Sequence, residues 1–173
     1  LPVALGQITD SNSFTLTASA REAGAVAFRV APVPDDETTL LSLIEDQLVR
    51  ADVIVTSGGV SAGAYDVVKT VLSELGTVTF DRVAMQPGMP QGFGTIGDDA
   101  TPIFTLPGNP VSAFVSFEVF VRPAIRKMLG VSRLHRPSVK AILQSTLRSP
   151  EGKRQFARAR WQPAPDGAYL VTP

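Results

Sequence analysis

The chain has 173 residues, with 16 basic and 16 acidic side chains, one histidine and no cysteine. A net charge of zero gives no bulk attraction to nucleic acid or to a membrane surface, and the absence of cysteine excludes disulfides and thiolate metal sites. No apolar run reaches the roughly 18 residues that suggest a membrane span, whereas 44% hydrophobic residues suffice for a core. We therefore expect a globular protein that binds neither nucleic acid nor membrane.

Helical and strand-like patterns alternate over most of the chain. Apolar residues at helical spacing, with capping residues before them and glycines after them, predict helices over Asp10–Ala23, Thr38–Val49, Asp66–Leu75 and Val111–Leu129. Short apolar runs predict strands over Ala25–Ala31, Asp52–Thr56, Val78–Met85, Phe93–Gly97 and Pro102–Leu106, the last two joined by the turn Gly97-Asp98-Asp99. This alternation predicts an α/β fold in three layers, with helices on both faces of a mainly parallel sheet.

The pattern changes after Gly130. Short strands are predicted over Val139–Leu147, Gln155–Trp161 and Ala168–Val171, with turns between them. We interpret residues 1–131 as an α/β domain and residues 132–173 as the start of a small β domain. Three strands make a thin core, so we expect more chain to follow.

Two glycine-containing loops are the strongest functional signal. The segments are Ser57-Gly58-Gly59-Val60-Ser61-Ala62-Gly63 and Leu106-Pro107-Gly108-Asn109-Pro110-Val111-Ser112. Each loop follows a predicted strand and leads into a predicted helix, which is where open parallel sheets bind ligands. Helix N-termini attract anions, and glycine lets a phosphate approach the backbone. The two loops therefore predict a site for a phosphorylated or otherwise anionic small molecule.

Three side chains around the first loop could act chemically. Ser61 can donate to a phosphate or an oxyanion, Asp66 can bind Mg²⁺ or accept a proton, and Lys69 can pair with Asp66 or with a phosphate. Each also has a structural interpretation. The glycines can serve only a tight turn, Ser61 and Asp66 can cap a helix, and Lys69 can form a surface ion pair.

Other candidates surround this edge of the predicted sheet. Pro107–Pro110 is stiffer than helix initiation needs, which favours a pocket wall, and Gln86-Pro87-Gly88-Met89-Pro90 is a third loop expected there. Asp35 and Asp36 are more often caps, although Asp35 and Asp66 could share a cation if the loops converge. Arg158 and Arg160 alternate on one predicted strand face, which we interpret as solvated.

Four motifs in order resemble the molybdopterin molybdenumtransferase family, which includes the bacterial MoeA proteins and the E domain of gephyrin. They are Asp10-Ser11-Asn12, Ser57-Gly58-Gly59-Val60-Ser61 with Asp66 and Lys69, Pro87-Gly88-Met89-Pro90, and Leu106 to Ser112. The resemblance implies a molybdopterin-binding, MogA-like fold followed by a small β-barrel domain. It also implies that the family's preceding strand, and two further N-terminal domains, lie outside this sequence.

The family inserts molybdenum into adenylated molybdopterin and releases AMP, the last step of molybdenum cofactor synthesis. The resemblance implies Asp66 and Ser61 as catalytic residues, and Asp35 with Asp66 at a Mg²⁺ site. Molybdate and adenylated molybdopterin would be the substrates. A homodimer, a molybdopterin adenylyltransferase as partner and a cytoplasmic location are expected. The implied substrate-binding residues are Ser57, Gly58, Gly59, Lys69, Pro90, Pro107, Gly108, Asn109, Pro110 and Ser112.

The chain departs from the family pattern at two positions. Members commonly have a lysine at the position of Gln86, and often another at that of Met89, so anion binding would be weaker here. With the missing domains, this predicts that the chain is inactive alone. Two alternatives are a molybdopterin adenylyltransferase of the same fold, which the β tail argues against, and a non-catalytic binding or scaffold module, which the lost lysines would suit.

Overall fold

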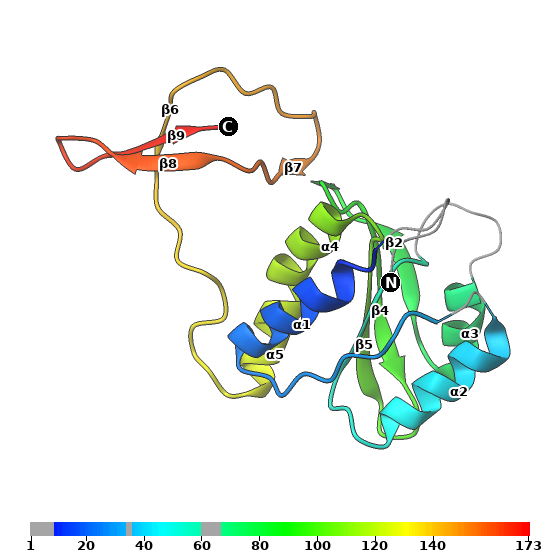
Figure 1. The fold of residues 1–173 in the computed structure, drawn as a ribbon. Coiled ribbons are helices and arrows are strands. Elements are labelled where there is room, and N and C mark those ends of the chain that lie inside the picture. The colour runs from blue at the N-terminus through cyan, green and yellow to red at the C-terminus, as the bar shows by residue number, and fades with distance from the viewer. Residues whose placement is uncertain (1–8, 34–35, 60–66) are drawn as a thin grey trace.

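A mixed four-stranded sheet forms the centre of the protein (Figure 1). The structure is a computed structural model that describes residues 9–33, 36–59 and 67–173. The strand order is β1-β5-β4-β2; β1 runs parallel to β5, while β5 with β4 and β4 with β2 are antiparallel. The strands are β1 (Ile54–Ser57), β2 (Thr79–Arg82), β4 (Pro90–Ile96) and β5 (Thr101–Leu106).

Helices cover both faces of this sheet (Figure 1). On one face, Phe104 and Leu106 of β5 pack with α1 (Asn12–Ala23) and with the helical run α4 (Pro110–Ser116), η1 (Phe117–Val121) and α5 (Arg122–Met128). On the other face, Ile103 packs with α2 (Glu37–Leu48) and α3 (Val67–Leu75). Side chains alternate across a strand, so β5 supplies both hydrophobic cores.

The four predicted helices are present, and the longest contains one irregular turn. The run from Pro110 to Met128 is helical throughout, but residues Phe117–Val121 form a π-helical turn. Pro123 follows directly and has no backbone N–H to continue the α-helical pattern, while its ring crowds the carbonyl one turn earlier. The π turn widens the helix at the place where this crowding arises.

The sheet differs from the mainly parallel arrangement that the sequence predicts. In the described part of the chain only one of its three strand pairings is parallel. The predicted turn Gly97-Asp98-Asp99 does form, with Gly97 at a φ of 69°, and it folds β5 back against β4 in the antiparallel sense. Ala25–Ala31 is not a strand: it leaves α1 through Gly24 and follows an extended path without ladder pairing. The sheet therefore lacks one of the strands that the sequence predicts.

Residues 132–173 form a loosely packed tail. β6 (Ile142–Leu143), β9 (Tyr169–Thr172) and β8 (Arg160–Pro163) make a three-stranded sheet in that order, and no closed barrel forms among the described strands. No residue from 132 to 173 is buried. The predicted strand Val78–Met85 ends early at Arg82, and Met85–Gln86 (β3) pairs in parallel with Arg154–Gln155 (β7) of the tail.

Across the described residues no helix combines the length and the apolar character that crossing a membrane requires.

Arg136 fastens the beginning of the tail to the helical face. Its guanidinium donates to both carboxylate oxygens of Glu22 at 2.9 Å, and to those of Glu118 at 2.6 and 3.0 Å. The hydrogen bond and the charge of Arg136 lower the pKa of the Glu22 carboxyl. Two bidentate contacts from one guanidinium give this anchor a defined geometry.

We expect Arg136→Met to speed cleavage of residues 132–153 by a broad-specificity protease, and high salt to reduce the difference from wild type. The pKa of Glu22 is lower than its ordinary 4.5, so the anchor is at full strength above about pH 4.5. It weakens as the pH falls through the lowered value. Arg133→Met is the matched control, and equal cleavage of both variants would contradict the anchor.

Candidate functional site

The two glycine-containing loops meet at one edge of the sheet. β1 and β5 are parallel, with Ser57 opposite Leu106, so both loops begin at the same edge. The Gly58 N–H donates to the Leu106 carbonyl at 2.9 Å, and a Cβ built on Gly108 would lie 3.5 Å from the Gly58 Cα. The expected proximity of these loops is therefore confirmed.

Gly58 and Gly59 are the described glycines of the first loop. Their φ angles are 93° and 74°, in the left-handed region that side chains other than glycine rarely adopt. Among the described residues, and apart from the two chain neighbours of Gly58, no heavy atom lies within 4 Å of a Cβ placed on Gly58. Within that part of the chain no other side chain fills the space on this side of the Gly58 backbone.

The third loop lies at the same edge. Pro90 begins β4 and pairs with Arg82, the last residue of β2, while Gly92 pairs with Thr105 of β5. Because β4 is antiparallel to β5, its first residues lie beside the last residues of β5. The loop Gln86–Pro90 is thus next to Pro107, as the sequence indicates.

Asn109 and Ser112 shape the start of α4. The backbone N–H groups of Val111 and Ser112 each donate to Oδ1 of Asn109 at 3.1 Å, and Pro110 occupies the first helical turn. Asn109 is therefore a helix cap. Pro107 is buried, whereas Gly108, Asn109 and Pro110 are exposed and available to a ligand.

Asn12 connects α1 to the second loop. Its Nδ2 donates to the Gly108 carbonyl at 2.8 Å, across 96 residues of sequence. Asp10 accepts from the Ser13 N–H at 3.0 Å, and hydrogen bonds from Ser13 lower the pKa of this carboxyl. The Asp10 carboxylate therefore satisfies a backbone N–H at the start of α1, and the contact made by Asn12 was not predicted.

Asp36 also acts as a helix cap. It accepts from the Thr39 N–H at 2.8 Å at the start of α2, and hydrogen bonds from Thr39 lower its pKa. The candidate metal ligands Asp35 and Asp66 and the candidate catalytic residue Ser61 lie outside the described residues. Among the residues that the structure describes, no group of three or more histidine, cysteine, aspartate or glutamate side chains is placed to hold a metal ion.

Lys69 lies in the first turns of α3, on the face of the sheet opposite α4. Its Nζ is 5.7 Å from the centre of the Phe80 ring, and the side chain is half-buried. This contact places the ammonium group of Lys69 beside β2, the outer strand on the far side of the sheet from β1.

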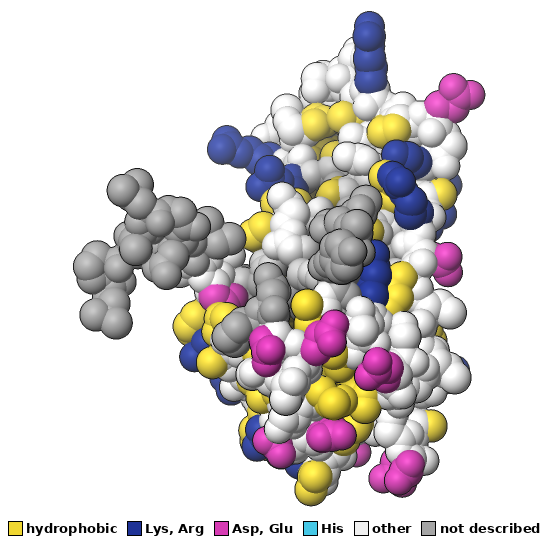
Figure 2. Space-filling view, turned by 90° about the vertical axis from the view of Figure 1, so that its right-hand side faces the viewer, with side chains coloured by type: hydrophobic (Ala, Val, Ile, Leu, Met, Phe, Trp, Pro, Cys, Tyr) yellow, Lys and Arg dark blue, Asp and Glu magenta, His cyan; other side chains and the backbone are white. Residues whose placement is uncertain are grey.

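Charge is divided unevenly between the two parts of the chain. Residues 132–173 carry eight basic and two acidic side chains, so the rest of the chain has an acidic excess. Figure 2 shows acidic side chains over the lower part, where α2 and α3 lie, and basic side chains near the top. The net charge of zero is therefore the sum of a basic tail and an acidic α/β part. The basic tail pairs with β3, at the start of the Gln86–Pro90 loop, through β7.

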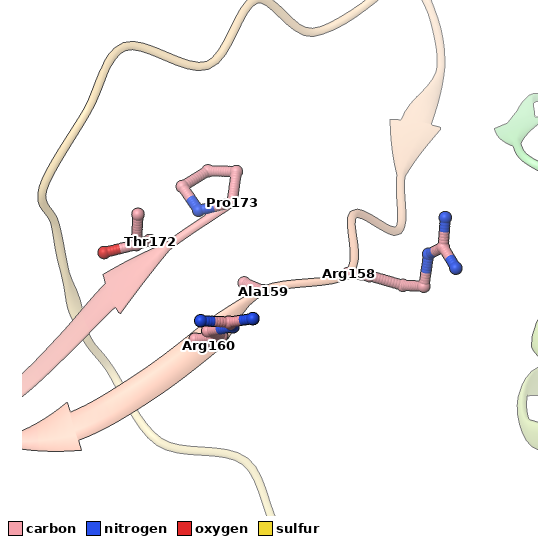
Figure 3. Close-up of a pocket in the computed structure, with 5 residues that line it drawn as sticks. All are labelled: Arg158, Ala159, Arg160, Thr172 and Pro173. Atoms are coloured by element: carbon pink, nitrogen blue, oxygen red, sulfur yellow. The ribbon is translucent and has the colours of Figure 1, made fainter.

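Two arginines of the tail lie apart from the loops. Arg158 and Arg160 line an open hollow of about 770 Å³ together with Ala159, Thr172 and Pro173. Arg158 precedes β8, whereas Arg160 is the first residue of that strand (Figure 3). The strand alternation expected for this pair is therefore wrong, because only Arg160 belongs to the strand.

Comparison with known proteins identifies the class of this chain. Residues 2–127 match the sequence family described as "Probable molybdopterin binding domain". The chain belongs to this molybdopterin-binding domain family.

The relatives that this chain matches are longer proteins. The chain is 50% identical to "Molybdopterin molybdenumtransferase 2" and 47% identical to "Molybdopterin molybdenumtransferase 1" of Mycobacterium tuberculosis, over 91% and 96% of this chain. It spans only 40% and 39% of those proteins. The crystal structure of a molybdopterin biosynthesis MoeA protein from Pyrococcus horikosii superposes with a TM-score of 0.76 at 32% identity, covering 100% of this chain and 40% of that one.

Proposed function

We propose that the protein containing this chain inserts molybdenum into adenylated molybdopterin and releases AMP. The observation that carries this proposal is the contact between the first two loops, where the Gly58 N–H bonds the Leu106 carbonyl. Within the described part of the chain, a Cβ placed on Gly58 meets no heavy atom within 4 Å, and the start of α4 beside it is exposed. The names of the relatives support molybdopterin as the ligand class and transfer of molybdenum as the reaction.

The loops would hold the phosphate bridge of the adenylate. Gly58 and Gly59, which have no side chains, would let anionic oxygens come close to the loop backbone, and the dipole at the start of α4 favours negative charge there. Ser57, Pro90 and Pro107–Pro110 would form the walls, and Lys69 would add a positive charge. This arrangement would fix the phosphorus atom for attack.

In the proposed reaction molybdate enters the site and AMP leaves it. A molybdate oxygen attacks the AMP phosphorus, and the bond between that phosphorus and the bridging oxygen of the molybdopterin phosphate breaks, which leaves AMP joined to molybdate through the attacking oxygen. The dithiolene sulfurs then form bonds to molybdenum, the bond between molybdenum and that oxygen breaks, and AMP leaves with the oxygen, while the thiol protons pass to a molybdate oxygen that departs as water. We assign Asp66 and Ser61 to this centre, Asp66 as a proton acceptor and Ser61 as a donor to the oxyanion. These roles come from the sequence and from the resemblance.

A magnesium ion belongs to the same proposal. Carboxylate oxygens are the protein ligands that Mg²⁺ prefers, so Asp35 and Asp66 are the side chains that would hold it. Asp36 precedes α2 and caps it, so the proposal assigns the ion to Asp35 of that pair. When bound, the ion would neutralise phosphate charge.

The wider organisation is also proposed. Residues 1–131 would form the molybdopterin-binding domain, and residues 132–173 would begin a β-barrel domain, of which β6, β8 and β9 are the described strands. The intact protein would be a cytoplasmic homodimer and would receive its substrate from a molybdopterin adenylyltransferase.

Two variants of Asn109 separate helix capping from ligand binding. Asn109→Ala removes the acceptor for two N–H groups and should lower the free energy of unfolding by about 1 kcal/mol. Asn109→Asp keeps the acceptor and should retain stability, but its carboxylate should weaken binding of the adenylate about tenfold. Chemical denaturation and equilibrium binding measure the two effects. Equal affinities of the two variants would argue against an anion beside Asn109.

The direct test is AMP release from adenylated molybdopterin by the full-length protein, with and without molybdate and Mg²⁺. We expect release that molybdate stimulates and that requires the magnesium ion. Tight binding without AMP release would instead identify a non-catalytic binding module. AMP transfer from ATP to molybdopterin would identify an adenylyltransferase, and absence of binding would reduce the loops to structural turns.

A further inference from the structure

The side chain of Gln91 joins the third loop to the helix that carries the second. Its Nε2 donates to the Gly88 carbonyl at 2.6 Å and to the Ser116 hydroxyl at 2.5 Å. Gln91 is the second residue of β4, and its backbone is held opposite Asp81 of β2. Ser116 is fully buried on α4. A strand, a loop and a helix therefore meet at one amide group.

The fit around this amide is close. Gly88 is buried at a φ of 93°, and a Cβ there would lie 2.7 Å from the Ser116 hydroxyl and 3.1 Å from Cε of Met85. Positive φ and contact with the helix both favour glycine at this position. The loop consequently packs directly on α4, and the Gln91 bonds fix its place there.

The opposite side of the loop is held by the tail. The Arg154 N–H donates to the Ala84 carbonyl at 2.9 Å, and the Phe156 N–H donates to the Gln86 carbonyl at 2.7 Å. The Met89 carbonyl accepts from the Val83 N–H at 2.7 Å. With its base and flank fixed in this way, the Pro87–Pro90 segment depends on Gln91 for its position relative to α4.

We infer that Gln91 and Ser116 are positioning residues for substrate binding. They hold the Pro87–Pro90 loop at a fixed distance from α4, whose capped start at Asn109 forms the facing wall of the site. This inference rests on the proposed function, because the ligand between the loops is the adenylate. Neither side chain needs to touch the substrate; their effect passes through the backbone of the loop.

The experiment compares three variants of the full-length protein. Gln91→Met removes both donated hydrogen bonds at similar size and without adding charge, and Ser116→Ala removes only the bond to the helix. Gln162→Met on exposed β8 is the matched control. We measure the dissociation constant for adenylated molybdopterin, kcat for AMP release, and hydrogen exchange of the peptide covering residues 86–91.

We expect Gln91→Met to raise the dissociation constant about tenfold and to speed exchange of residues 86–91 by a similar factor, with kcat at saturation within about twofold of wild type. Ser116→Ala should show the same pattern with about a threefold effect, and it tests the inference even if Gln91→Met does not fold.

An unchanged dissociation constant in both variants would overturn the inference, whether or not exchange of residues 86–91 becomes faster, because the position of the loop would then not affect ligand binding. A fall in kcat without a change in binding would also overturn it. Failure of the wild-type protein to bind the adenylate is a separate result, which removes the proposed function itself.

Discussion

Asp66→Asn should reduce AMP release from adenylated molybdopterin by about 10²–10⁴-fold in the full-length protein, the usual contribution of a positioned proton acceptor. The amide keeps the size of the side chain but has no negative charge, so it neither accepts a proton nor attracts a cation. Initial rates at saturating adenylate and molybdate measure the effect, and thermal unfolding shows whether the variant is folded.

Asp52→Asn is the matched control for this change. Asp52 is exposed and precedes β1, at the end of the strand remote from the glycine-containing loops. Its rate should equal that of wild type within about twofold, because no proposed ligand contact lies there. A similar rate for Asp66→Asn and Asp52→Asn would remove Asp66 from the reaction centre.

Phe117→Ala should lower the free energy of unfolding by about 3–5 kcal/mol, the usual cost of emptying a buried aromatic site. Phe117 is fully buried in the core that joins β5 to α1 and the long helix. Its loss leaves a cavity at the π-helical turn, where the wide backbone limits collapse. Denaturant dependence of hydrogen exchange in β5 measures the change for this domain within the full-length protein.

Phe114→Ala provides the comparison. This side chain lies on the same helix but is 41% exposed, so its truncation leaves no enclosed cavity. We expect a loss of no more than about 1 kcal/mol. Equal losses for Phe114 and Phe117 would show that the helix is not held by the buried face described above.

Local patterns in the sequence determined the helices and their caps. Asp36 and Asn109 precede apolar residues at helical spacing, and both accept hydrogen bonds from the first turn of the helix that follows. Gly97 likewise formed the predicted turn. These features involve residues within a few positions of one another, so their physical causes are visible in the sequence. The ordered motifs were sufficient to indicate the family to which the chain belongs.

The direction of strand pairing needed the tertiary structure. Apolar runs predict strands but not their partners, and Ala25–Ala31 has a strand-like composition without pairing in a ladder. Close approaches between backbone segments could not be predicted from the sequence either. A Cβ on Gly94 would lie 2.3 Å from the Thr77 carbonyl oxygen, so glycine is required there by a neighbour that its local sequence does not reveal.

The sequence by itself determined which loops are the candidates for the site and where they begin, because glycine, proline and capping residues act on their immediate neighbours. Only the tertiary structure decided how those loops are held together. Asn12 reaches Gly108 across 96 residues, and Gln91 reaches Ser116 across 25. Such contacts depend on how β4, α1 and α4 pack against the sheet, and packing is set by the whole chain, since each partner is positioned by a different part of the core.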